Sequence, residues 1–355
     1  MNSGTVLQCV IRIADPARAS RIVEGRSVLG WKLRELSRFG VTDALLLADH
    51  APADHLPAGL GTLLLPRPVR ITVSGRYGGE TLSGVRDQLQ ERFLLCEDAV
   101  PFDWNLANLL ADAAGDGPEA IGRIACRDGP TSLGIGVFRK ALVDHPEPVR
   151  GLEAGVLADL AGRGLLRTTT IGGEAARPDG TPGETGRRRR ALFLDRDGVL
   201  NIDHGYVGSR DRFDWVDGAL DAIGHATQAG WHVFIVTNQS GVARGLYTED
   251  AVRDLLDWIA GQARAAGGTI DDARFCPYHP DGTVDVYRQI HPWRKPLPGM
   301  LLDLIQAWEL EPARAVMIGD QPTDMRAAAA AGVAGHLFGG GNLLAFLRPI
   351  LDAFG

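Results

Sequence analysis

The sequence predicts an α/β fold with two domains, each a mainly parallel sheet flanked by helices. Short apolar runs, which are typical of buried strands, alternate with amphipathic helical stretches in both halves of the chain. The 355 residues exceed the roughly 250 at which a single core stops growing. Residues 172–190 are rich in glycine, proline and charge, as linkers are. We therefore expect one domain over residues 1–171 and another over residues 191–355.

The first half begins with an apolar strand. Expected strands cover residues 6–13 and 44–48, with a helix over residues 27–39 between them and a second helix within residues 85–93. Leu29, Leu33 and Leu36 recur at helical spacing in the first helix. The second helix leads into a strand that ends in Glu97 and Asp98.

The second half repeats this rhythm more clearly. Expected strands cover residues 191–194, 231–238, 273–276 and 315–319; expected helices cover residues 217–229 and 248–265, begin near Pro298, and close the core with an alanine-rich segment after residue 321. The segments between these elements are too short for a large cap domain. We therefore expect an open site that is shaped by small loops.

Asp195 and Asp197 follow the strand over residues 191–194 directly. The carboxyl end of such a strand is where open α/β sheets bind ligands. Two carboxylates at one point repel each other, so they favour a divalent cation between them, and oxygen ligands favour Mg²⁺. An aspartate-rich turn that caps the next element is the alternative interpretation.

Three later stretches favour the metal site over the aspartate-rich turn. WHVFIVTNQSG (231–241) and AVMIGDQPTD (315–324) are apolar strands that end in polar residues, and WRKPLPGM (293–300) carries two cations before a helix start. The strand ends of a parallel sheet meet at one edge. A nucleophile, a phosphate donor, a cation and a metal-binding acid are therefore expected there together.

These stretches resemble the four motifs of the haloacid dehalogenase (HAD) superfamily of phosphatases, in order and complete. DRDGVLNIDHGYV, TNQSGVARG, RKPLPGM and GDQPTDMRAAAAAG are similar to the branch that contains D,D-heptose 1,7-bisphosphate phosphatases and histidinol phosphatases. The resemblance covers roughly residues 191–345. It implies a Rossmann-like HAD core without a large cap.

The resemblance implies a role for each motif residue. Asp195 would attack phosphorus and carry a transient aspartyl-phosphate, and Asp197 would act as general acid and then base. Thr237 would bind the transferring phosphoryl oxygens, and Lys295 would neutralise their charge.

A magnesium site is implied as well. Asp320 would hold Mg²⁺ together with Asp195 and the backbone carbonyl of Asp197. Asp324 would orient Lys295 or a loop. Ordinary helix capping is the alternative for Asp320 and Asp324.

Substrate contacts rest on the same resemblance. The sugar side would be lined by Asp203, His204, Gly205 and Tyr206, and the second-strand loop completed by Asn238, Gln239 and Ser240. Arg294 would grip a distal phosphate, for which a planar guanidinium is suited. Loop packing is the alternative for His204 and Tyr206.

The branch also carries a structural zinc ion, held by a Cys-x-His pair and a Cys-x-Cys pair before the RKP motif. Here the corresponding positions read Cys276-Pro-Tyr278 followed by His279, and His291-Pro-Trp293. Cys276, His279 and His291 are candidate Zn²⁺ ligands, but a tetrahedral site takes four. We therefore favour a loop packed around Tyr278 and Trp293 over a zinc site.

The first half resembles a sugar-1-phosphate nucleotidyltransferase domain in SVLGWKLRELSRFGVTDALLLADH and FLLCEDAVPFDWNL. Asp98 lies where that family places a metal-binding aspartate. The opening stretch CVIRIADPARASRIVEG lacks the family's glycine cluster, without which a backbone cannot approach phosphate closely. We interpret this half as a catalytically degenerate domain; retained nucleotidyl transfer, in a bifunctional enzyme, is the alternative.

Composition narrows the class of protein. A net charge of −7 and 45% hydrophobic residues are typical of a soluble globular protein without a general nucleic-acid or membrane surface. The four cysteines form no paired pattern, and no apolar run approaches the roughly 18 residues of a membrane span. We expect a cytoplasmic protein, and interpret the arginines at 187–190 as a solvated hinge. The oligomeric state is left open.

The sequence thus predicts a magnesium-dependent phosphatase acting on a phosphorylated sugar. The resemblance favours D-glycero-D-manno-heptose 1,7-bisphosphate, cleaved at the 7-phosphate, with histidinol phosphate as the alternative. A sugar nucleotidyltransferase-like first half favours a role in the synthesis of surface polysaccharide.

Overall fold

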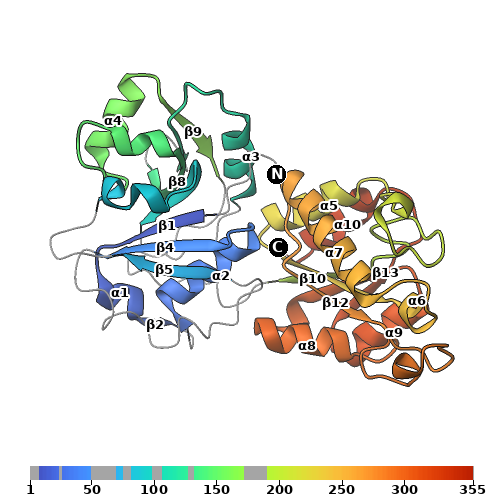
Figure 1. The fold of residues 1–355 in the computed structure, drawn as a ribbon. Helices are drawn as coiled ribbons and strands as arrows, with labels where there is room; N and C mark the ends of the chain where they lie inside the picture. Colours follow the sequence, from blue (N-terminus) through green and yellow to red (C-terminus); the bar gives the residue numbers. More distant parts are fainter. Residues whose placement is uncertain are drawn as a thin grey trace. The chain divides into compact units, whose positions relative to one another are not determined.

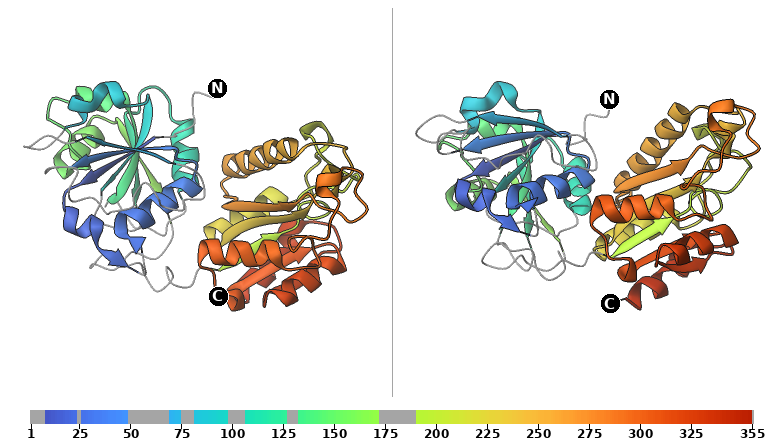
Figure 2. Two further views of the ribbon diagram at one scale, coloured as in Figure 1. Left: turned by 60° about the horizontal axis from the view of Figure 1, so that its bottom comes forward. Right: turned by 90° about the horizontal axis from the view of Figure 1, so that it is seen from below.

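The computed structural model describes residues 8–23, 26–48, 69–74, 81–97, 106–126, 132–171 and 190–354. The chain divides into two compact units, Met1–Arg187 and Arg188–Gly355. As predicted, each is an α/β unit with a mainly parallel sheet between helices (Figure 1, Figure 2). The expected linker up to residue 189 and Asp98 lie outside the described residues. None of the described helices has the length and apolar content needed to cross a bilayer.

The first unit contains a seven-stranded sheet in the order β5-β4-β1-β6-β8-β7-β9. Its strands are β1 (Gln8–Ile13), β4 (Asp43–Ala48), β5 (Arg70–Ser74), β6 (Arg92–Glu97), β7 (Gly122–Cys126), β8 (Ser132–Arg139) and β9 (Leu166–Thr170). Only β8 runs antiparallel to its neighbours among these strands. A separate ribbon pairs β2 (Ile22–Val23) with β3 (Arg26–Ser27).

Helices cover both faces of this sheet. They are α1 (Pro16–Ser20), α2 (Val28–Arg38), α3 (Ala107–Gly115) and α4 (Ala154–Gly162), with 3₁₀ turns η2 (Leu82–Gln88) and η3 (Lys140–Asp144). Helix α2 begins where Ser27 Oγ accepts from the Gly30 amide at 3.0 Å, and its leucines pack on the sheet with α3. The prediction of an α-helix within residues 85–93 is wrong. The 3₁₀ turn η2 ends at Gln88 and β6 begins at Arg92, and Val85 interrupts the turn with non-helical φ/ψ.

The second unit holds a five-stranded sheet in the order β12-β11-β10-β13-β14, all parallel. The strands are β10 (Ala191–Leu194), β11 (His232–Asn238), β12 (Asp272–Cys276), β13 (Ala315–Gly319) and β14 (Ala334–Leu337). Leu194 pairs with Ile235 on one side and with Ile318 on the other. The central strand β10 therefore ends between β11 and β13.

Side chains that alternate along β10 pack against different helices. The helices are α5 (Ala219–Gln228), α6 (Ser240–Ala243), α7 (Glu249–Ala265), α8 (Gly299–Trp308), α9 (Pro322–Ala330) and α10 (Leu343–Asp352), with 3₁₀ turns η5 (Arg210–Arg212), η6 (Asp285–Tyr287) and η7 (Pro312–Arg314). Leu192 and Leu194 pack with α5, α7 and α10, whereas Ala191 and Phe193 pack with α8 and α9 (Figure 1). Burial on both faces explains why β10 reads as a continuous apolar run.

Candidate active site

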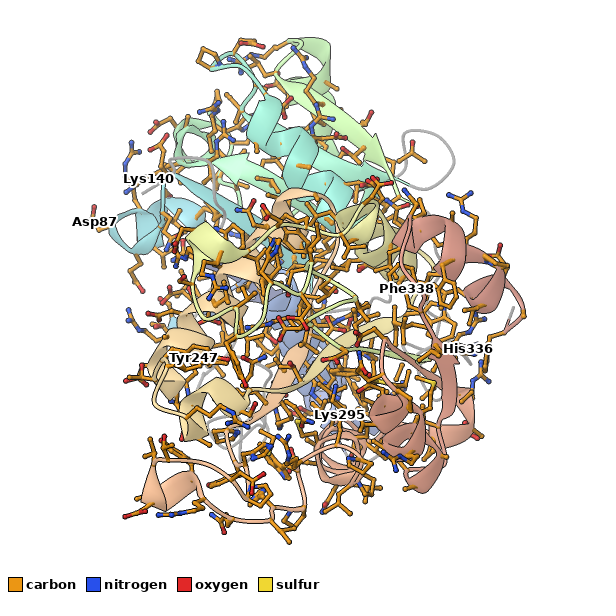
Figure 3. All side chains as sticks on the ribbon, turned by 90° about the vertical axis from the view of Figure 1, so that its right-hand side faces the viewer. Asp87, Lys140, Tyr247, Lys295, His336 and Phe338 are labelled. Atoms are coloured by element: carbon orange, nitrogen blue, oxygen red, sulfur yellow. The ribbon has the colours of Figure 1, made fainter. Side chains whose placement is uncertain are left out.

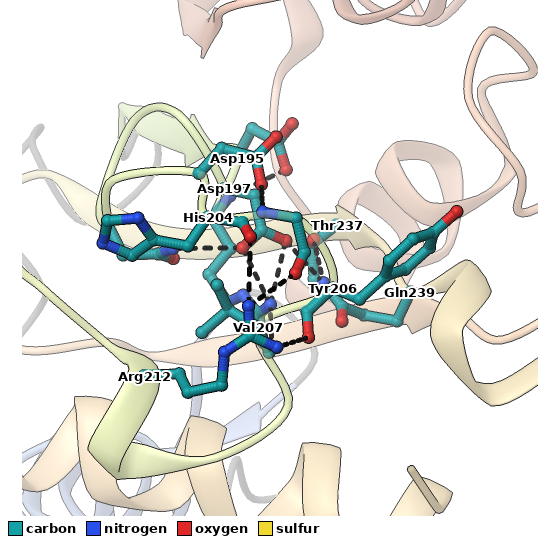
Figure 4. Close-up of polar contacts among 12 residues, drawn as sticks. Asp195, Asp197, His204, Tyr206, Val207, Arg212, Thr237 and Gln239 are labelled. Atoms are coloured by element: carbon teal, nitrogen blue, oxygen red, sulfur yellow. Dashed lines mark hydrogen bonds and ion pairs between the residues drawn. The ribbon is translucent and has the colours of Figure 1, made fainter. Parts of the chain in front are cut away.

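Three strand ends of the second unit meet at one pocket. Asp195 follows β10, Thr237 lies near the end of β11, and Asp320 follows β13. The pocket has a volume of about 270 Å³ and is lined by Asp195, Asp197, Asp203, Gly205, Tyr206, Thr237, Asn238, Ser240, Tyr247, Lys295, Asp320, Gln321, Thr323 and Asp324. Tyr247 and Lys295 are labelled in Figure 3, and Figure 4 shows the polar contacts around the two motif aspartates.

Lys295 is the buried cation of this pocket. Its Nζ lies 2.8 Å from Asp195 Oδ2 and 2.7 Å from Asp324 Oδ1, and donates to the Val236 carbonyl at 3.0 Å. The three contacts match the three protons of an ammonium group. Asn238 fixes the Lys295 backbone through two hydrogen bonds of 3.1 Å each.

Burial and charge shift the acid–base behaviour of these groups. Burial raises the pKa of Asp195 to about 7, although the charge of Lys295 opposes this shift. Burial lowers the pKa of Lys295, but the charges of Asp195 and Asp324 outweigh it, so the net shift is upward. Burial also raises the pKa of Asp320. Asp195 and Asp320 therefore hold protons more readily than isolated carboxyl groups do.

The same carboxylates form a group that fits a divalent cation. Oxygen atoms of Asp195, Asp320 and Asp324 lie within 4.8 Å of one another. Gly198 makes room for this group, because a Cβ there would lie 2.3 Å from Asp320 Oδ2, and its φ of +81° also favours glycine. Hard oxygen donors of this kind suit Mg²⁺.

Asp195 is engaged on both carboxylate oxygens, since Oδ2 contacts Lys295 and Oδ1 accepts the Arg196 amide at 2.7 Å. Asp324 is likewise engaged on both. Its Oδ1 contacts Lys295, and its Oδ2 accepts the Gln321 amide at 3.1 Å as part of a capping box on α9. Asp320 is half-buried and accepts one hydrogen bond, from the Gln321 side chain at 2.9 Å. Asp320 is therefore the member with the fewest contacts, while Asp324 contacts the lysine that it is predicted to orient.

Asp197 is clamped between two polar side chains (Figure 4). Arg196 Nη2 donates to both of its carboxylate oxygens at 2.8 and 2.9 Å, and Gln239 Nε2 donates to Oδ2 at 2.9 Å. Asn201 Nδ2 adds a contact to Oδ1 at 3.1 Å. Arg196 is fully buried and also donates to the Val207 carbonyl. The orientation of Asp197 is thus set from several directions.

The loop after the first motif closes one side of the pocket. Asp203, Gly205 and Tyr206 line it, whereas the His204 ring is bonded to Asp214 Oδ2 at 2.8 Å and is not among the lining residues. Arg212 donates to the carbonyls of His204 and Gly205 at 3.0 Å each and of Tyr206 at 3.3 Å (Figure 4). A single guanidinium group therefore holds the backbone of this loop.

Two other expected substrate contacts lie apart from the pocket surface. Gln239 is only 1% exposed, and its amide NH₂ donates to Asp197 and Thr237. Arg294 donates to the Tyr278 carbonyl at 3.2 Å and is not a lining residue. Ser240 does line the pocket, as expected of that loop.

The candidate zinc ligands lie in a loop packed around aromatic rings. The His291 ring stacks on Tyr278 at 4.2 Å and meets Trp293 edge-on at 6.1 Å. Nδ1 of His279 and Nδ1 of His291 each accept a backbone amide hydrogen bond. Across the described residues, the group of potential metal ligands consists of the three aspartates and does not include Cys276.

Three residues of the site are not among those predicted from the sequence: Arg196, Arg212 and Tyr247. The sequence does contain a signal for Arg196, because a charged residue within a buried motif needs partners for its guanidinium group. Arg212 contacts the site loop through backbone carbonyls, whereas Tyr247 lines the pocket and bonds to the Gln239 side chain. No pattern of residue types predicts such contacts.

Comparison with known proteins shows the family of this chain. A D-glycero-beta-D-manno-heptose-1,7-bisphosphate 7-phosphatase of Rhodopseudomonas palustris is 48% identical over 164 residues, which cover 46% of this chain and 91% of that protein. The chain belongs to the HAD-like phosphatases. The protein of the same name from Escherichia coli K12 is 43% identical over 143 residues, which cover 40% of this chain and 75% of that protein.

Two further similarities concern the family and a solved structure. Residues 292–344 of this HAD-like phosphatase match the family described as "HAD-hyrolase-like". A crystal structure of D,D-heptose 1,7-bisphosphate phosphatase from B. bronchiseptica, complexed with magnesium and phosphate, is 37% identical and covers 45% of this chain and 86% of that chain, with a TM-score of 0.39. Membership in this family makes the chain a phosphoric monoester hydrolase.

Proposed function

We propose that the chain is a magnesium-dependent sugar phosphatase that works through an aspartyl-phosphate on Asp195. The observation that carries this proposal is the convergence of Asp195, Thr237, Lys295 and Asp320 on one pocket in a HAD-like phosphatase. Asp195, Asp320 and the backbone carbonyl of Asp197 would hold Mg²⁺. When bound, this ion supplies positive charge against the repulsion between a carboxylate and a phosphate.

The proposed chemistry divides hydrolysis into two displacements. An oxygen of Asp195 attacks phosphorus, the bond from phosphorus to the sugar oxygen breaks, and Asp197 gives that oxygen a proton. Water then attacks phosphorus, Asp197 takes the proton from this water, and the bond to Asp195 breaks. Lys295 and the Thr237 hydroxyl stabilise the charge on the phosphoryl oxygens. General acid–base catalysis of this kind contributes roughly 10²–10⁴-fold.

The proposed substrate is D-glycero-D-manno-heptose 1,7-bisphosphate, cleaved at the 7-phosphate. Support comes from the relatives of that name, which align over most of their own length. Asp203, Gly205 and Tyr206 would face the sugar, and Ser240 would complete the loop of the second motif. Histidinol phosphate remains the alternative named by the sequence, with no structural observation in its favour.

Phosphate release from a panel of sugar bisphosphates and histidinol phosphate, with Mg²⁺ present, tests this proposal. We expect the heptose bisphosphate to give the highest kcat/KM, and ³¹P NMR should show that the 1-phosphate remains. Comparable slow rates on every compound would overturn the substrate but not the phosphatase chemistry. Loss of the 1-phosphate first would overturn the proposed position of cleavage.

We also propose that residues 1–171 form a degenerate nucleotidyltransferase-like domain joined by a linker over residues 172–190. Support comes from the missing glycine cluster in the opening stretch over residues 9–25. Isothermal titration of the full chain with nucleoside triphosphates and Mg²⁺ tests this assignment. We expect no heat of binding in the micromolar range, and saturable binding would instead favour the bifunctional alternative.

A further inference from the structure

We propose that Tyr247 and Gln239 form a positioning pair that aligns Asp197 and Thr237 with each other. The inference rests on the proposed function, because it assigns the leaving-group proton to Asp197 and the phosphoryl grip to Thr237. The pair would act through these two side chains. Neither Tyr247 nor Gln239 would need to touch the reacting atoms.

The hydrogen bonds of Gln239 connect the two catalytic side chains directly (Figure 4). Its Nε2 donates to Asp197 Oδ2 and to Thr237 Oγ1, each at 2.9 Å. An amide NH₂ has two donors, so both are used. Gln239 is 1% exposed, which leaves no water to replace a contact that is lost.

Tyr247 selects the orientation of that amide. Its hydroxyl donates to Gln239 Oε1 at 2.8 Å, so the oxygen faces Tyr247 and the NH₂ faces Asp197. If the amide turned over, its oxygen would face the Asp197 carboxylate, and the two acceptors would repel each other. Burial raises the pKa of Tyr247 to about 12, so the hydroxyl keeps its proton near neutral pH.

The Tyr247 ring packs closely against two glycines. A Cβ on Gly208 would lie 2.3 Å from the ring, and a Cβ on Gly241 would lie 2.2 Å from it. Both positions therefore need glycine to admit the ring, and the ring has little room to move. Packing of the ring therefore restricts the position of the hydroxyl that bonds to Gln239.

The substitution Tyr247→Phe tests the pair because it removes the hydroxyl and keeps the packed ring. Gln239→Met removes both amide donors at similar side-chain length. Tyr287→Phe is the matched control, since Tyr287 lies in the same unit and bonds to Glu249 outside this network. Steady-state kinetics on two probes, heptose 1,7-bisphosphate and p-nitrophenyl phosphate, give kcat and KM for each variant.

The choice of probes separates alignment from general damage. The sugar oxygen needs a proton as it leaves, whereas p-nitrophenolate does not. We expect Tyr247→Phe to lower kcat/KM, which reports the first displacement, roughly tenfold on the heptose substrate, in line with the cost of a small misalignment. On p-nitrophenyl phosphate kcat/KM should fall by a smaller factor, because only the grip of Thr237 is affected in that step. Gln239→Met should show the same pattern with a larger loss, and KM should change little.

Several results would overturn the pair. An equal loss of kcat/KM on both probes, a loss confined to KM, or no loss in Tyr247→Phe would each contradict the proposal, as would an equal loss in Tyr287→Phe. If Gln239→Met does not fold by circular dichroism, Tyr247→Phe decides alone. A Tyr247→Phe protein that does not fold would also contradict it. A wild-type protein inactive on both probes would contradict the proposed function and this role together.

Discussion

Lys295 Nζ lies 2.8 Å from Asp195 Oδ2, and both side chains are buried at the end of the central strand of the second unit. Asp324 approaches the same ammonium group from another side at 2.7 Å. One cation therefore faces two buried carboxylates. The surplus of negative charge would favour a metal ion at this point of the pocket.

Magnesium affinity should depend on pH. Because the pKa of Asp195 is raised to about 7, the metal-free protein carries a proton there at lower pH, and a cation must displace it. We expect the Kd for Mg²⁺ to fall about tenfold per pH unit from about pH 5 to about pH 7 and then to level off. Isothermal titration in buffers of different ionisation enthalpy measures affinity and proton release together. A Kd that does not change over this range would contradict the assignment.

The raised pKa of Asp195 also determines how the stability of the protein changes with pH. The folded pKa of Asp195 lies above the unfolded value near 3.9, so the folded state binds more protons between roughly pH 4 and pH 7. The free energy of unfolding of the metal-free protein should therefore fall as pH rises through this window. Asp195→Asn should fall less steeply than wild type in thermal melts at several pH values. Parallel profiles for the two proteins would count against a raised pKa.

Gly198→Ala should weaken metal binding. The added Cβ would lie 2.3 Å from Asp320 Oδ2, at a residue whose φ is already +81°. Gly230→Ala is the matched control, because its φ is +80° and nothing lies within 4 Å of the added carbon. Both variants should lose about 1–2 kcal/mol of stability from the backbone conformation. Only Gly198→Ala should raise the Kd for Mg²⁺; an equal effect in both would contradict the close approach.

Lys295→Met should destabilise the second unit and abolish turnover. Removing the cation leaves Asp195 and Asp324 buried without their charge partner, which typically costs 3–5 kcal/mol. Urea unfolding followed by circular dichroism measures this loss. Turnover should vanish even under conditions where the variant is folded, because the phosphoryl charge is no longer neutralised. A folded variant with near-normal kcat would exclude the proposed role of Lys295.

Arg212→Ala should affect substrate binding more than chemistry. Arg212 holds three carbonyls of the loop that carries Gly205 and Tyr206, and it does not line the pocket. We expect KM for the heptose substrate to rise about tenfold, with kcat on p-nitrophenyl phosphate nearly unchanged. The control is Arg210→Ala in the same 3₁₀ turn. A fall in kcat without a rise in KM would show that the loop acts on chemistry instead.

The strands of the site could be predicted because burial on both faces leaves a continuous apolar run, as in β10 and β13. Parallel order then brings Asp195, Thr237 and Asp320 to one edge. The position of Gln239 could not be predicted. Its backbone leaves the strand with φ of −113° and ψ of 60°, and its side chain is buried outside the pocket lining. Long-range contacts decide such a turn, and residue type alone does not.

Position in a motif also says little about which atoms face the ligand. Arg294 was expected to grip a distal phosphate, but its guanidinium group bonds to the Tyr278 carbonyl in the structure. His204 was expected on the sugar side, but its ring is paired with Asp214. The Arg294 guanidinium group and the His204 ring each have a hydrogen-bond partner in a neighbouring loop. These partners compete with the ligand for the side chain, and the motif alone does not reveal them. Their roles toward substrate stay predictions.

Phosphate release by Asp195→Asn, compared with wild type, tests the central claim most directly. The substrate is heptose 1,7-bisphosphate with Mg²⁺, and acid quenching with mass spectrometry follows any phosphoryl group on the peptide that contains Asp195. We predict turnover and a phosphorylated Asp195 peptide in wild type, and neither in the folded variant. Turnover by the variant, or a phosphoryl group found on another residue, would contradict the assignment of Asp195 as the nucleophile.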